Sequence, residues 1–122
     1  GLDLTYQARA VPEIRERLAK ITSPAGVFLG QVLEQFGAKY RASKGFDAPP
    51  VHDACAVAYV IDPAVIDIRQ APVHVEYRGL YTSGMTVADL RKKAPEDCHT
   101  FVATDLHQDQ FWDLVDRTVR EL

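Results

Sequence analysis

The feature that most constrains the fold is an apolar run held between two proline stops. Pro49-Pro50 precedes the run, which extends from Asp53 to Ile61, and Asp62-Pro63 ends it. Periodicity alone does not separate a buried helix from a buried strand in so short a run. Several alanines and Cys55 favour a helix that is packed on all sides. The residue before a proline avoids helical geometry, so the helix is expected to stop at Asp62.

A titratable pair lies at the start of this run. His52 and Asp53 follow the proline-stiffened loop directly and precede an element that is otherwise apolar. Polar groups at the mouth of a buried element are costly unless they are hydrogen-bonded or used. The pair is therefore the first candidate for proton chemistry or metal ligation.

The remaining elements predict an α/β fold in one domain over residues 1–122, with a few strands packed against about four helices. Alternation in Gly1 to Thr5 predicts a strand. Pro12 and Ser23-Pro24 are typical of helix starts, and the second of these helices should end in a loop at 42–50. The other expectations are a strand at 73–77 with one wet and one dry face, a turn at 86–89, a strand at 100–103 and a helix from about 108.

Charge and cysteine content exclude several classes of protein. The net charge is -3, with 14 basic and 17 acidic residues. A nucleic-acid binder or an anionic-membrane binder usually carries a basic surface, so neither is expected. Two cysteines make neither a disulfide scaffold nor a zinc site, and a reducing, cytoplasmic setting is expected. The chain begins with Gly1 and not with methionine, and we expect it to be the back part of a longer protein.

Four collinear pieces resemble one enzyme family. They are the segment from Pro50 to Tyr59 followed by Asp62-Pro63, the opening Gly1 to Thr5, the segment from Val75 to Asp89, and Phe111 to Leu114. Together they resemble the C-terminal portion of the inosine-uridine preferring nucleoside hydrolases. The resemblance implies hydrolysis of the N-glycosidic bond of a ribonucleoside to base and ribose, with a calcium ion that binds the ribose hydroxyls and a water. It also implies an oxocarbenium-like transition state.

The resemblance assigns three site residues. His52 would be the leaving-group acid or a base-contacting residue, and Asp53 a calcium ligand. Tyr40, or a neighbour in the segment from Tyr40 to Lys44, would approach the nucleobase from a mobile flap. The aspartate cluster that supplies most calcium ligands and the catalytic base in this family has no counterpart here. Calcium takes roughly 6–8 oxygen ligands, so Asp53 alone cannot hold it. We therefore expect the chain to carry one part of the active site and to be inactive alone.

Plainer interpretations stay open for each residue. Asp53 could cap the helix that follows it. His52 could be a partly exposed loop histidine, and Tyr40 could pack in the core as part of its helix's apolar stripe. At the level of function, the alternatives are a non-enzymatic binding or assembly module that keeps the family's C-terminal fold, and one half of a split enzyme. Apolar surface along the opening segment and the 53–61 helix predicts a homo-oligomer.

Overall fold

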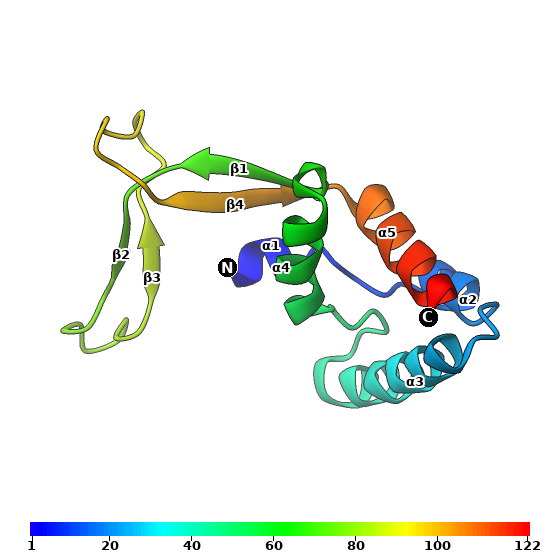
Figure 1. Ribbon diagram of the computed structural model, residues 1–122. Coiled ribbons are helices and arrows are strands. Elements are labelled where there is room, and N and C mark those ends of the chain that lie inside the picture. Colours follow the sequence, from blue (N-terminus) through cyan, green and yellow to red (C-terminus); the bar gives the residue numbers. More distant parts are fainter.

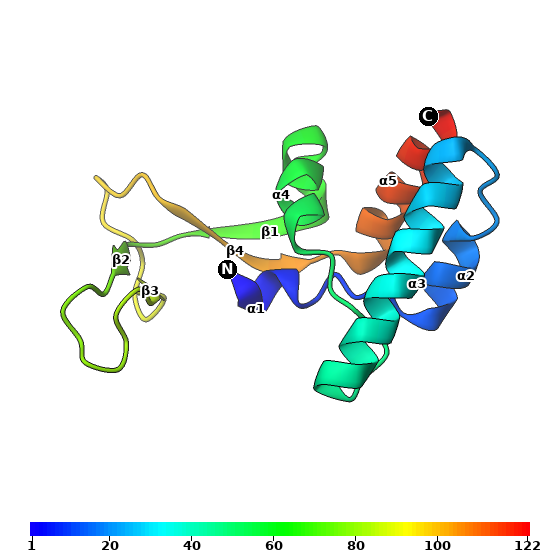
Figure 2. The same cartoon turned by 90° about the horizontal axis from the view of Figure 1, so that it is seen from below.

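The computed structural model describes all residues, 1–122, as a group of helices joined to an extended β arm (Figure 1). The elements in chain order are α1 (Leu2–Thr5), α2 (Pro12–Leu18), α3 (Pro24–Lys44), α4 (His52–Ile61), a 3-10 turn (Pro63–Val65), β1 (Ile66–Gln70), β2 (Val73–Val75), β3 (Thr86–Ala88), β4 (Phe101–Leu106) and α5 (Gln108–Glu121). The helices α2, α3 and α5 lie together at one end, α1 and α4 lie centrally, and the strands lead away from them (Figures 1 and 2).

Local sequence signals set the ends of the long helix α3. The Gly26 N–H donates to the Ser23 hydroxyl at 3.2 Å, and Pro24 occupies the first turn. This confirms the predicted N-cap, which satisfies one of the free N–H groups of the first turn. The helix ends at Gly45, whose φ of 77° is readily adopted only by glycine.

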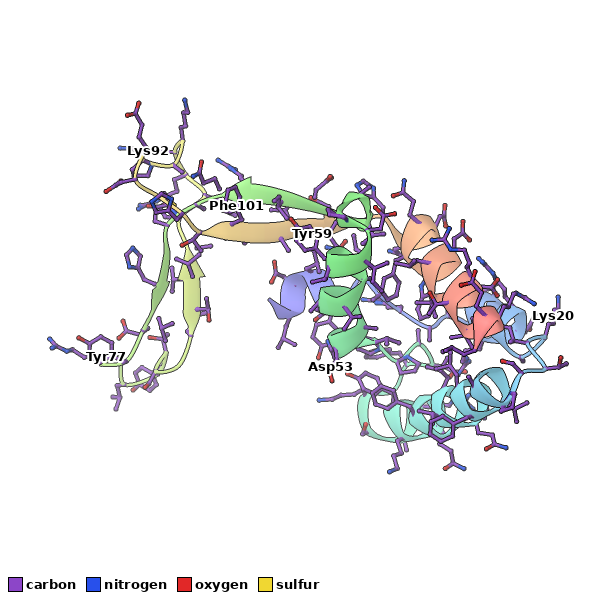
Figure 3. All side chains as sticks on the ribbon, viewed as in Figure 1. Lys20, Asp53, Tyr59, Tyr77, Lys92 and Phe101 are labelled. Carbon is purple, nitrogen blue, oxygen red and sulfur yellow. The ribbon has the colours of Figure 1, made fainter.

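The strands form two separate antiparallel pairs. β1 pairs with β4 in a ladder that is irregular between Asp67 and Ile68, and β2 pairs with β3. The β2–β3 hairpin lies at the far end of the β1–β4 ribbon and turns sharply from its direction, and Tyr77 lies near the hairpin's tip (Figure 3). Both faces of β2 are open, because Val75 and His74 are both exposed. The predicted dry face is therefore absent, since no other element covers it.

The core lies between α4, α5 and the first residues of the chain. Phe111 is 0 % exposed, and its ring meets that of Trp112 edge-on with 5.0 Å between centroids. Leu18, Val65 and Cys55 complete the most deeply buried side chains of this cluster. Cys55 and the Phe111-Trp112 pair thus belong to the core.

Three local expectations were wrong. Residues 2–5 form the helix α1 and not a strand, because Leu4 turns into the core and no backbone partner pairs with this segment. Residues 86–88 form β3 and not a turn, because they bond to β2. The helix α4 is not packed on all sides, since the side chains of Val57, Val60 and Ile61 are exposed. Periodicity is uninformative over segments of three or four residues, which explains the first two errors.

The molecule exposes more surface than its size predicts. A folded monomer of this mass has an accessible area of roughly 6,600 Å², whereas this chain exposes 8566 Å². Much of the exposed apolar area lies on α4 and on the β arm. For α4, this agrees with the expected apolar surface along the 53–61 helix. No helix combines the length and the apolar character needed to cross a bilayer.

Candidate active site

Two distant backbone segments cross immediately before His52. The Ala10 N–H donates to the Pro49 carbonyl at 3.0 Å, and the Val51 N–H donates to the Ala8 carbonyl at 2.9 Å. Arg9 and Pro50 form an antiparallel bridge between these bonds. The buried prolines stiffen one side of this crossing. The first residue of α4 is consequently placed by contacts that are about 40 residues apart in sequence.

The imidazole of His52 is held by the end of α1. The Thr5 hydroxyl oxygen lies 2.7 Å from His52 Nδ1. The Tyr6 ring meets the imidazole edge-on, at 5.2 Å between centroids and 88° between planes. His52 is half-buried, and its Nε2 makes no hydrogen bond. One ring nitrogen is thus engaged and the other is free.

The side chain of Gln7, just after α1, binds the backbone of β4. The Leu106 N–H donates to Gln7 Oε1 at 2.9 Å, and Gln7 Nε2 donates to the Thr104 carbonyl at 3.3 Å. The side-chain amide thus gives β4 one acceptor and one donor, the same groups that the backbone of a neighbouring strand would provide. They explain why the opening segment needs no strand geometry to lie beside β4.

His52 borders an open cavity of about 280 Å³ between α1, α4 and the β1–β4 ribbon. Its lining is mostly apolar and contains no aspartate or glutamate; it consists of Gly1, Leu4, Thr5, His52, Cys55, Ala56, Tyr59, Ile66, Ile68, Phe101 and Ala103. Burial raises the pKa of the Cys55 thiol, so this cysteine stays protonated and is no nucleophile. His52 is the only imidazole in this lining.

A larger groove between α2 and α3 is a weaker candidate. It has a volume of about 540 Å³ and is lined mainly by polar and charged side chains, including Arg15, Glu16 and Glu34. It brings together no histidine, cysteine or hydroxyl that could act on a substrate. We therefore place the candidate site at His52.

Tyr40 lies one aromatic ring away from His52. Its ring meets Phe36 and Phe46 edge-on, with centroids 5.2 and 5.3 Å apart. A hydrogen bond with the Tyr6 hydroxyl raises the pKa of Tyr40 above its usual range. Tyr6 therefore neighbours both predicted site residues, since its ring meets that of His52 and it raises the pKa of Tyr40. Tyr40 is half-buried and is not a core residue.

An ion-pair network holds the loop after α3. Asp47 accepts from Arg15 Nη1 at 2.9 Å and from Arg41 Nη2 at 2.6 Å. The hydrogen bond from Arg15 is the main reason why the pKa of Asp47 is lowered. This network joins α2 to the segment that carries Phe46. The spacing in the sequence gives no sign of it, because Arg15 and Asp47 are 32 positions apart.

Asp53 stands apart from this cluster. It lies in the first turn of α4 and is exposed, and Figure 3 shows it at the end of α4 that faces the loop. Its carboxylate caps no backbone N–H, so the capping interpretation is wrong. No three acidic, histidine or cysteine side chains gather where they could hold a metal ion.

Comparisons with known proteins point to one enzyme family. The model of the inosine-uridine preferring nucleoside hydrolase family matches residues 1–113. Proteins of that name from Crithidia fasciculata and Leishmania major are each 44% identical, over 115 and 116 residues, and each match covers 94% of this chain and 36% of the relative. The chain thus spans about a third of the length of these relatives.

Solved structures show the same fold. The purine-preferring ribonucleoside hydrolase from Gardnerella vaginalis superposes with a TM-score of 0.78 at 20% identity, over 100% of this chain and 40% of that one. A plant nucleoside hydrolase gives a TM-score of 0.79 at 19% identity, over 100% and 40%. The α/β architecture is therefore that of part of the nucleoside hydrolase fold. The chain belongs to the inosine-uridine preferring nucleoside hydrolase family.

Proposed function

We propose that this chain contributes the leaving-group side of a ribonucleoside hydrolase active site. The observation that supports this most is the half-buried His52 ring, whose Nδ1 is engaged by Thr5 while Nε2 is unpaired, beside an open cavity. The ring lies in the segment that the family model matches. The substrate would be a ribonucleoside, because the names of the relatives specify inosine and uridine.

The chemistry needs a proton donor at the base. When the bond between the anomeric carbon and the base nitrogen breaks, the electron pair stays on the base. A proton from His52 Nε2 neutralises that charge, and water then completes the hydrolysis at the cationic sugar. A positioned general acid of this kind accelerates a reaction by roughly 10²–10⁴-fold.

Tyr40 would contact the nucleobase. Its ring packs edge-on against those of Phe36 and Phe46, so α3 and the loop after it carry a small aromatic cluster. Aromatic rings offer flat apolar area to a planar base, and a hydroxyl adds one directional contact. This arrangement is compatible with a flap that closes over the substrate.

The carboxylate that would activate the water is not supplied here, because no acidic side chain lines the cavity. Asp53 would be one calcium ligand among others that lie outside these 122 residues. Calorimetric titration of the chain with calcium should show no binding at micromolar concentration, because one carboxylate supplies at most two of the roughly 6–8 oxygens. Tight binding that is lost in Asp53→Asn would contradict this.

A chimera tests the function directly. The segment of the Crithidia fasciculata relative that aligns with this chain is replaced by this chain, and ribose release from inosine and from uridine is measured. We expect hydrolysis by the chimera and a loss of roughly 10²-fold or more in kcat on His52→Ala. The isolated chain should release no ribose.

The outcomes separate the alternatives. Hydrolysis by the isolated chain would overturn its assignment as one part of a site. A folded chimera whose kcat is unchanged by His52→Ala would overturn the role of His52. A folded chimera that binds a nucleoside but never cleaves it favours the non-enzymatic binding module.

A further inference from the structure

We propose that Asp47 is a positioning residue that holds residues 45–50 against α2 and α3. This segment connects the two predicted site residues, because Tyr40 lies near the end of α3 and His52 begins α4. The inference rests on the proposed function for its purpose, but the contacts that hold the segment do not depend on catalysis.

Asp47 forms one ion pair with each of these two helices. Its Oδ1 accepts from Arg15 Nη1 on α2 at 2.9 Å, and its Oδ2 accepts from Arg41 Nη2 on α3 at 2.6 Å. The Arg15 side chain is only 14 % exposed. Charge-assisted hydrogen bonds are stronger than neutral ones, and partial burial reduces their screening by salt. We call these two ion pairs the clamp.

A buried glycine of α3 makes room for the clamp. Glycine inside a helix is less favourable than alanine, so a glycine at position 37 weakens α3 by itself. A Cβ atom at Gly37 would collide with Arg15 Nη1 and would lie 3.3 Å from Asp47 Oδ1. Gly30, on the same helix, has open space where its Cβ would be. The Arg15–Asp47 pair therefore occupies the space that a side chain at position 37 would need.

Phe46 carries the effect of the clamp to the site. Its ring meets that of Tyr40 edge-on at 5.3 Å, and the Arg9 guanidinium carbon lies 5.9 Å from its centroid. Arg9 Nε donates to the Tyr6 carbonyl at 3.1 Å, and the Tyr6 ring meets the imidazole of His52. The clamp lies one residue away from Phe46 and keeps these contacts together.

The clamp should act on binding of the nucleobase. If the segment is loose, Phe46 and Tyr40 take several arrangements, and the substrate must order them when it binds. The loss therefore appears in KM, while kcat for the bound substrate changes little.

Limited trypsin digestion of the 122-residue chain tests the clamp without catalysis. Lys44 directly precedes the segment, and the exposed Lys93 serves as internal reference. Cleavage after Lys44 relative to Lys93, measured by mass spectrometry, should rise roughly 3- to 10-fold in Asp47→Asn, since one or two ion pairs are lost. Asp47→Glu should restore part of the protection. An unchanged ratio in Asp47→Asn overturns the clamp. So does wild-type cleavage that is faster after Lys44 than after Lys93, whether or not a variant folds.

A matched carboxylate controls for general loss of stability. Asp116 on α5 is also paired with two arginines, Arg17 on α2 and Arg120 on its own helix. Asp116→Asn should leave cleavage after Lys44 nearly unchanged. An increase equal to that in Asp47→Asn overturns the proposal, because the effect would then be global.

Two glycine variants test the packing argument. Gly37→Ala should increase cleavage after Lys44, because the new Cβ displaces the Arg15 guanidinium. Gly30→Ala should give a rate at or below that of the wild type, because alanine favours the helix in both cases. Equal rates in the two variants overturn the role of the glycine and of the Arg15 pair.

The chimera described above connects the clamp to substrate binding. There Asp47→Asn should raise KM for inosine roughly 3- to 10-fold with kcat little changed, and Asp47→Glu should bring KM back towards the wild-type value. An unchanged KM, or a fall in kcat alone, overturns the positioning role. If His52→Ala leaves kcat unchanged while Asp47→Asn opens the segment to trypsin and raises KM, the proposed role of His52 fails and the positioning by Asp47 stands.

Discussion

The side chain of Gln7 attaches the α1 segment to β4, and replacing Gln7 should lower the stability of the fold considerably. Gln7→Ala removes the acceptor of the Leu106 N–H and the donor to the Thr104 carbonyl, which are now bonded at 2.9 and 3.3 Å. Leu106 is buried, so its N–H would be left without a partner. Each bond contributes about 1 kcal/mol, and the orphaned N–H brings the loss of unfolding free energy to roughly 2–3 kcal/mol.

Urea titration followed by circular dichroism measures this loss, which corresponds to a fall of about 10 °C in Tm for a chain of this size. Gln35→Ala is the control, because Gln35 is exposed on α3 and makes no hydrogen bond; its effect should stay within about 0.5 kcal/mol. Gln7→Glu keeps an acceptor for Leu106 but offers no donor to Thr104, and should fall between the two. Equal stabilities of Gln7→Ala and Gln35→Ala would refute the reasoning.

Further expectations concern the thiols, the ion pair and the open surface. Cys55 is 1 % exposed and its thiol pKa is raised, so iodoacetamide followed by mass spectrometry should modify the native protein at Cys98 alone; equal rates would contradict this. Because Arg15 lowers the pKa of Asp47, their bond stabilises the fold above the ordinary pKa of 3.8 and is lost as pH falls through the lower folded value. The Tm difference between wild type and Asp47→Asn should therefore shrink below about pH 4; a constant difference would argue against it. Self-association should appear in sedimentation velocity and weaken in Val60→Lys, since Val60 is 81 % exposed on α4; a monodisperse wild-type monomer would count against it.

The helices were predictable because their signals are local. Ser23-Pro24 before α3 and Asp62-Pro63 after α4 act within a few residues, and the structure confirms both. α1 was not predictable, because its place depends on Gln7, whose partners on β4 lie 97 and 99 positions further along the chain. Alternation of Leu2 and Leu4 has no meaning over so few residues.

The residues of the candidate site also differ in whether a local sequence signal indicates them. His52 stands out in the sequence because a titratable residue opens an apolar run. Thr5 and Tyr6 do not, because no local pattern near either residue indicates a partner 47 or 46 positions away. Asp47 was recognised only as part of a loop, since its main ion pair is equally remote. The roles of His52, Tyr40 and Asp53 stay predictions.

The crossing of residues 8–10 with 49–51 has a consequence for how the protein folds. Everything between these segments, including α2 and α3, is a closed loop whose ends must meet before the imidazole finds its hydroxyl partner. Closing such a loop is entropically unfavourable, and non-local pairings of this kind form late. α3 can become helical from its own sequence, whereas the surroundings of His52 exist only once this loop has closed. The ring's magnetic environment would then serve as a built-in reporter of loop closure.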